Sequence, residues 1–235
     1  MRRAKHFFSY KLLRVLVLGS VLVIITLQFQ LKKVIVIAPR INNIHLEILN
    51  NKNLLFLNVG QIKRSILANN MDIKSLTIKK IFPQTLELDY ILRDPKAILS
   101  SPHGYKLLSE DGIIISQQTN NEQNLPVIET SSLNINSNND WRLLKALTYL
   151  KLLTKLDISV NKIIQEDDLS VYKIFLGDNS EIIIPQNADP YLISPSLQLI
   201  IYRFRIEGKF ISIIDFSYDK PVVTFKNGGK TLSLE

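Results

Sequence analysis

Residues 76–92 read Leu-Thr-Ile-Lys-Lys-Ile-Phe-Pro-Gln-Thr-Leu-Glu-Leu-Asp-Tyr-Ile-Leu. Apolar and polar side chains alternate on both sides of Phe82-Pro83-Gln84, which is the pattern of strands with one buried face. Pro83 has no backbone N–H to donate, so it suits a connection between strands better than either strand. The stretch therefore predicts an antiparallel pair of strands joined at Phe82-Pro83-Gln84.

The residues before this pair predict the rest of a small domain. The β-branched run 34–37 is followed by Ala38-Pro39, which indicates a first strand. Asn58 can cap a helix whose apolar residues recur at helical spacing, and residues 44–50 could form a second short helix. The order strand, helix, helix, strand, strand indicates an α+β module, to which we assign residues 32–98.

The residues from 99 to 235 predict a second, β-rich domain with flanking helices. Asp140 can cap one helix, and Ser194 followed by Pro195 indicates the start of another, which Gly208 would end. Alternating or β-branched runs predict strands at 158–160, 171–176, 181–184, 210–216 and 221–225. We therefore expect an α+β protein with two folded domains after residue 31.

The net charge of +8 is concentrated at the N-terminus. Residues 1–33 carry seven basic groups and no acidic group, whereas residues 34–235 carry 22 basic and 21 acidic groups. A protein that binds nucleic acid through phosphates needs clustered Lys and Arg on its folded surface. The charge balance after residue 33 argues against a nucleic-acid partner.

A run of uncharged residues, 15–31, lies between Arg14 and Lys32. A hydrocarbon core of roughly 30 Å needs about 20 helical residues, and snorkelling of the two flanking cations extends the reach of a shorter run. The run predicts a transmembrane helix in contact with the lipid bilayer. Basic residues are more numerous before it than just after it, which predicts a cytoplasmic tail at 1–14 and extracytoplasmic domains. A cleaved signal peptide is the alternative, and it would also export the chain.

The sequence offers no convincing site for catalysis or for a metal. It has no cysteine, and none of its three histidines has a second histidine at ligand spacing. Ser101, His103 and Asp111 lack the surrounding glycines of a nucleophile elbow. The acidic run 166–168 lacks the alternating ligands of a calcium loop. We expect no cofactor, no metal and no enzymatic activity.

Landmarks along the chain resemble those of a known family. Phe82-Pro83-Gln84-Thr85-Leu86, a strand, and then Arg93-Asp94-Pro95-Lys96-Ala97 are similar to the aromatic-Pro-x-Thr-Leu, strand, Arg-Glu-Pro-x-Ala pattern of the POTRA domain in bacterial cell-division proteins of the FtsQ/DivIB type. Three further landmarks follow in the family's order, namely Glu110-Asp111-Gly112, Leu125-Pro126-Val127-Ile128 and Ile214-Asp215-Phe216-Ser217-Tyr218-Asp219.

The resemblance implies a scaffold at the division septum of the plasma membrane. It would bind small bitopic coiled-coil proteins of the FtsB and FtsL type, with other membrane proteins of the division machinery, and help to control septal peptidoglycan synthesis. The family's partner site lies on the last strand and the one before it, which implies Tyr218 and Phe225 here, with the neighbours Val222, Val223 and Thr224. A strand with a free edge can accept a partner strand through main-chain hydrogen bonds.

Two other functions remain open from the sequence. A membrane-anchored component of an envelope assembly or secretion system could also use a POTRA-like module, and it would need several such modules in tandem. An exported, membrane-anchored enzyme would need ionisable side chains that converge in a cleft.

Overall fold

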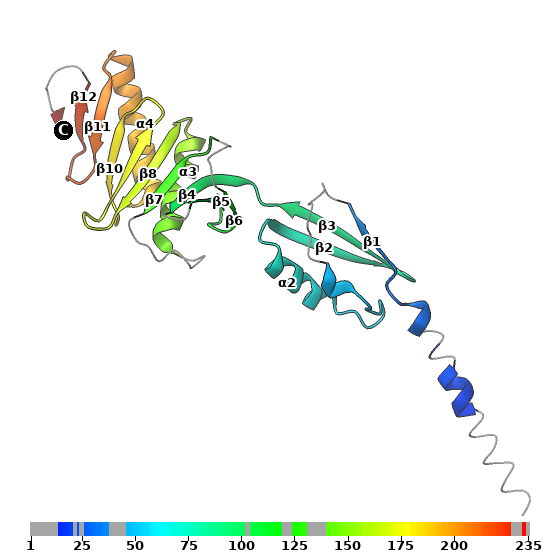
Figure 1. Ribbon diagram of the computed structural model, residues 1–235. Helices are drawn as coiled ribbons and strands as arrows, with labels where there is room; N and C mark the ends of the chain where they lie inside the picture. Colours follow the sequence, from blue (N-terminus) through cyan, green and yellow to red (C-terminus); the bar gives the residue numbers. More distant parts are fainter. Residues whose placement is uncertain are drawn as a thin grey trace, which may run out of the picture. The chain divides into compact units, whose positions relative to one another are not determined.

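The computed structural model describes residues 14–20, 23, 26–37, 46–101, 104–118, 124–130, 140–226 and 232–233. The chain divides into two compact units, Met1–Arg93 and Asp94–Glu235, and each has its own β-sheet (Figure 1). The sequence predicts a first domain over residues 32–98, whereas the compact N-terminal unit ends at Arg93. Pro95 begins strand β4 (Pro95–Ser101), and at the first position of a strand the missing N–H of proline is tolerated.

The N-terminal unit is a three-stranded sheet with helices on one face. Its elements in chain order are β1 (Lys33–Val36), the 3-10 helix η1 (Glu47–Leu49), α2 (Val59–Asn69), β2 (Ile73–Ile81) and β3 (Thr85–Leu92). The described strands lie in the order β1-β3-β2, with β1 parallel and β2 antiparallel to β3. The predicted strand pair is confirmed, and its two members are joined by residues 82–84 as expected.

Helix α2 covers one face of this sheet (Figure 1). The Asn58 side chain accepts a hydrogen bond from the Gln61 N–H at 3.1 Å, which confirms the predicted cap. Ile62 and Ile66 point into a buried apolar cluster that includes sheet residues such as Leu86. The local signals of capping and periodicity therefore agree with the packing in this unit.

The predicted transmembrane helix is not found among the residues that the structure describes. Of the stretch 15–31, residues 15–20, 23 and 26–28 are helical, but residues 29–31 have left the helix. They are held by the N-terminal unit, because Phe29 O accepts from Leu54 N at 2.8 Å and Leu31 N donates to Lys52 O at 2.9 Å. Within the described part of the chain, no helix combines the length and apolar character needed to cross a membrane.

The C-terminal unit is built on one mixed sheet. The described strands follow the order β13-β12-β11-β10-β9-β8-β7-β4-β5-β6. After β4 the chain contributes β5 (Gly104–Ser109), β6 (Ile114–Gln118), β7 (Val127–Thr130), α3 (Trp141–Lys155), β8 (Val160–Glu166), β9 (Val171–Leu176), β10 (Glu181–Pro185), α4 (Pro190–Ile206), β11 (Ile211–Asp215), β12 (Val222–Phe225) and β13 (Leu232–Ser233). The neighbours β4–β7, β7–β8 and β10–β11 are parallel, and the remaining pairs are antiparallel.

Helices α3 and α4 cover one face of this sheet (Figure 1). Their apolar stripes and the inward residues of the strands form one buried cluster, which includes Leu147 of α3, Phe204 of α4 and Val223 of β12. The opposite face carries half-buried side chains, among them the ion pairs Lys162–Glu129 at 2.8 Å and Lys173–Glu166 at 2.7 Å. The face with α3 and α4 therefore holds the core, and the other face is mixed in character.

A small polar network fixes the start of α3. Asp140 accepts from the Arg142 backbone N–H at 2.9 Å, which confirms the predicted cap. Arg142 also forms ion pairs with Asp140 at 3.1 Å and with Asp167 at 3.2 Å. Burial would raise the pKa of Asp140, but the hydrogen bonds and charge of Arg142 hold that pKa below its usual value. The network joins α3 to the turn between β8 and β9.

Helix α4 begins earlier than the sequence signal at Ser194-Pro195 indicated. It starts at Pro190, and the Asp189 side chain caps it by accepting from the Tyr191 N–H at 2.9 Å. Asp189-Pro190 offers the same combination of a capping residue and a proline at the first position. Ser194 is thereby placed in the helix interior, on the face that points into the core.

Ser194→Ala is expected to raise the free energy of unfolding by about 1 kcal/mol. The Ser194 hydroxyl is fully buried and has no hydrogen-bond partner among the described residues, so alanine removes an unsatisfied polar group and favours the helix. Urea denaturation of the full chain followed by circular dichroism measures the change. A loss of stability would contradict the prediction, because it would mean that the hydroxyl has a partner.

Candidate partner-binding surface

The C-terminal strand pair places the predicted partner-binding residues at one end of the large sheet. One side of β12 pairs with β11, with Val223 opposite Ile214. On its other side, β13 pairs with Val222 and Val223 alone among the described residues. Beyond Val223, the outer edge of β12 has no described strand beside it.

The backbone of β12 presents a donor at this outer edge. Lys226 N donates to Phe210 O at 2.9 Å, so its N–H points toward the β11 side. Because N–H groups alternate in direction along a strand, the N–H of Phe225 points away from β11. The end of β12 therefore directs a main-chain donor to its outer side, where no described residue pairs with it.

The five predicted partner-binding residues lie in different environments and differ in burial. Val223 is buried in the core, and its neighbours Val222 and Thr224 are half-buried on the sheet face opposite the helices. The ring of Phe225 packs edge-on against Phe204, with 5.0 Å between ring centroids. Of the five, only Tyr218 is largely exposed, with 63% of its surface open to solvent.

The backbone before Tyr218 is held firmly. Ser217 N donates to the Asp215 carboxylate at 2.8 Å, and Phe216 N donates to Ile183 O of β10 at 2.9 Å. These bonds fix the chain where it leaves β11 and enters the turn to β12. The exposed Tyr218 ring is therefore displayed from an anchored turn beside the end of the sheet.

Phe225 also contacts a cation. The Nζ of Lys209 lies 5.7 Å from the Phe225 ring centroid and 5.6 Å from that of Phe204. Phe225 is thus half-enclosed by groups of its own chain. Its packing supports a structural role, which the sequence alone could not separate from a binding role.

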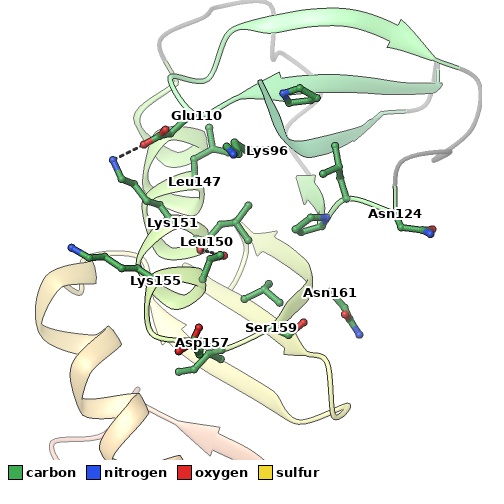
Figure 2. A pocket seen from close by; sticks show the side chains of 16 residues that line it. Lys96, Glu110, Asn124, Leu147, Leu150, Lys151, Lys155, Asp157, Ser159 and Asn161 are labelled. Atoms are coloured by element: carbon green, nitrogen blue, oxygen red, sulfur yellow. Dashed lines mark hydrogen bonds and ion pairs between the residues drawn. The ribbon is translucent and has the colours of Figure 1, made fainter. Parts of the chain in front are cut away.

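A groove of about 890 Å³ lies elsewhere on the C-terminal unit (Figure 2). The second half of α3 forms one wall, and the segment 157–161 that leads into β8 forms part of another. Leu147 and Leu150 of α3 contribute apolar surface, whereas Lys151 and Lys155 lie nearer its outer side. The groove therefore combines an apolar wall with a cationic border.

The charged groups of the groove are mostly paired. Lys151 contacts Glu110 at 2.5 Å, and the hydrogen bond to this carboxylate raises the pKa of Lys151. Lys96 pairs with Asp94 at 2.6 Å. The sixteen residues around the groove, all of them described, include neither histidine nor cysteine.

Other residues considered from the sequence fall in different places. His6, His45, His103 and the side chain of Ser101 lie outside the described residues. In the acidic run, Glu166 pairs with Lys173 and Asp167 pairs with Arg142. No group of three or more His, Asp or Glu side chains within the described ranges could hold a metal ion.

Sequence reasoning missed the outer face of α4. The sequence predicts that Leu197, Ile200, Ile201 and Phe204 face inward. Three of them are buried, and Ile201 is partly buried against the core. On the opposite side, however, Leu192, Leu199, Tyr202 and Ile206 are exposed. Their spacing of three and four residues could have revealed this second apolar stripe, but only the structure shows which stripe faces the core.

No protein-family model and no curated protein matches the sequence. Among solved structures, the chain is similar to the major extracytoplasmic domain of the trans isomer of the bacterial cell division protein DivIB from Geobacillus stearothermophilus. The two share 13% sequence identity with a TM-score of 0.33, over 48% of this chain and 97% of the other. A likeness at this level leaves both fold and role to be argued from the chain's own residues.

Proposed function

We propose that this protein is a non-catalytic scaffold of the bacterial division machinery that binds other proteins through the end of its C-terminal sheet. The observation that carries the proposal is the end of the large sheet, where the exposed Tyr218 lies in the turn before β12 and where, among the described residues, only Val222 and Val223 of β12 pair on the outer side. A strand of a partner protein added there would gain main-chain hydrogen bonds, with side chains giving specificity.

The division role is supported by the order of the sequence landmarks. The residues around Phe82-Pro83 and Arg93-Asp94-Pro95, and the late segment 214–219, resemble the FtsQ/DivIB family. In this role the partners are small bitopic proteins of the FtsB and FtsL type, together with other membrane proteins of the division machinery. The protein would act on the extracytoplasmic side of the plasma membrane at the septum, where it helps to control peptidoglycan synthesis.

Tyr218→Ala is expected to weaken binding of the FtsB-type partner about tenfold, as loss of an exposed aromatic anchor at an interface does. The ring projects from the anchored turn before β12, so its removal takes away contact area without opening the core. Co-expression of the tagged full chain with the partner, followed by quantitative pull-down, measures the effect.

Trp141→Ala is the matched control. Trp141 is also an exposed aromatic residue, but it begins α3 rather than flanking β12. Its loss should leave the recovery of the partner unchanged. Equal recovery with Tyr218→Ala and with the unaltered chain would remove Tyr218 from the binding surface.

Depletion of the protein tests the division role itself. Cells that lose a division scaffold should continue to grow and form filaments or enlarged undivided cells. A fluorescent fusion should form a band at midcell. Normal division after depletion, with signal spread evenly over the envelope, would contradict the role and favour envelope assembly or secretion instead.

A further inference from the structure

The outer face of α4 carries a narrow apolar stripe. Its members alternate at spacings of three and four residues, and they are Leu192, Pro195, Leu199, Tyr202 and Ile206. This is the spacing of the a and d positions of a heptad, which form the contact line of a coiled coil. At about 1.5 Å rise per residue, the stripe extends for roughly 21 Å along the helix.

The stripe points away from the core of its own unit. Residues 194, 197, 200 and 204 face the sheet, so the stripe lies on the opposite side of the helix. Leu192, Leu199, Tyr202 and Ile206 are 65–72% exposed. The core of this unit buries only one of the two apolar faces of α4, so the second apolar face is left exposed to solvent.

Cations border the second half of the stripe. In the heptad frame, Arg203 and Arg205 occupy the e and g positions on its two sides. Arg203 lies 3.6 Å from Glu207, which Lys209 also contacts at 2.7 Å. Arg205 is exposed and makes no ion pair within the described part of the chain. The border therefore keeps a net positive charge.

We propose that this stripe binds an amphipathic helix of another protein, one whose own apolar heptad line is bordered by acidic residues. Interhelical pairs between e and g positions set partner choice in coiled coils, so the two arginines select Glu or Asp on the incoming helix. The surface is distinct from the edge of β12 and takes a helix rather than a strand. It goes beyond the proposed function and does not depend on it.

The charge of the border and the narrowness of the apolar stripe favour such a helix over two other occupants, a second copy of α4 and a membrane surface. A second copy of α4 carries no acidic residue at the e and g positions within the helix, so it offers no complement to Arg203 and Arg205. A helix that lies on a membrane surface presents a broad apolar face and a polar face to water. Here the apolar line is narrow, and the other side of α4 is buried in the protein.

Two synthetic 21-residue peptides test the proposal with the full chain. Both carry Leu at a and d, and one carries Glu and the other Lys at every e and g position. Fluorescence anisotropy of the labelled peptides measures the dissociation constants. The Glu peptide should bind at least tenfold more tightly than the Lys peptide, in line with the size of charge selection between helices.

Three variants locate the binding and its charge preference. Leu199→Glu should weaken binding of the Glu peptide at least tenfold. Leu169→Glu is the control, because Leu169 is similarly exposed, at 65%, but lies outside α4, and it should leave binding unchanged. Arg205→Glu should weaken binding of the Glu peptide and strengthen binding of the Lys peptide. A loss of folding could not produce this reversal of the preference between the two peptides.

Several results would overturn the proposal. They are no binding of either peptide, equal binding of both, or equal effects of Leu199→Glu and Leu169→Glu. Dimerisation of the chain that Leu199→Glu abolishes, measured by light scattering, would assign the stripe to a second copy. Binding to vesicles with anionic lipids that Leu199→Glu abolishes would assign it to a membrane surface.

Discussion

We expect Phe225→Ala to lower the free energy of unfolding of the C-terminal unit by about 3 kcal/mol. The Phe225 ring packs edge-on against Phe204, with 5.0 Å between centroids, and the Lys209 ammonium lies 5.7 Å from it. Alanine removes the aromatic pair and the cation–π contact, and it exposes part of Phe204. Urea denaturation of the full chain, followed by the fluorescence of Trp141 in the same unit, measures the loss.

Tyr218→Ala is the control for this prediction. Its ring is exposed and outside the core, so the stability should change by less than about 0.5 kcal/mol. An unchanged stability in Phe225→Ala would contradict the structural role, and Phe225 would then again be a candidate partner-binding residue. If stability falls as expected, weaker partner recovery in Phe225→Ala reports damage to the unit rather than a lost contact.

Gly112→Ala is expected to destabilise the C-terminal unit by about 2 kcal/mol. Gly112 turns the hairpin between β5 and β6 with φ of +77°, where a side chain is strained. A Cβ at this position would also lie 2.8 Å from Leu144 Cδ2, on α3. The side chain of Leu144 must rotate or the hairpin must shift, and either change disturbs the packing of the hairpin on α3.

Gly208→Ala separates the two causes. Gly208 has φ of +67°, but a Cβ there would meet no atom within 4 Å, so only the backbone strain applies. We expect a loss of about 1 kcal/mol, and thermal denaturation can compare the two variants directly. Equal losses would show that the contact with Leu144 costs nothing, which would contradict the close packing of hairpin and helix.

Most signals that act over a few residues were read correctly from the sequence, although the cap of α4 is Asp189 and not Ser194. Asn58 and Asp140 cap their helices, and Gly112 and Gly208 adopt the positive φ angles that their turns require. The strand pair around Phe82-Pro83-Gln84 also forms as predicted. These features depend on hydrogen bonds and periodicity within one segment, so neighbouring residues are enough to specify them.

The sequence predicted the strands that carry the candidate residues but not the environment of each side chain. The sequence places Tyr218 and residues 222–225 at the last predicted strand pair, and β11 and β12 form there. It could not show that Val223 faces the core or that Phe225 packs against Phe204 of a distant helix. The short strand β13 beside Val222 and Val223 was not foreseen either.

The sequence by itself determined the caps of α2 and α3 and the strand pair around Phe82-Pro83-Gln84, because these features follow from interactions along the chain. Tertiary structure alone decided that residues 29–31 join the N-terminal unit instead of extending a helix, because their hydrogen-bond partners are Lys52 and Leu54, more than twenty residues away. It also decided which of two apolar stripes of α4 is buried. Both stripes have helical spacing, and only packing against the sheet distinguishes the face that forms the core from the face that remains exposed.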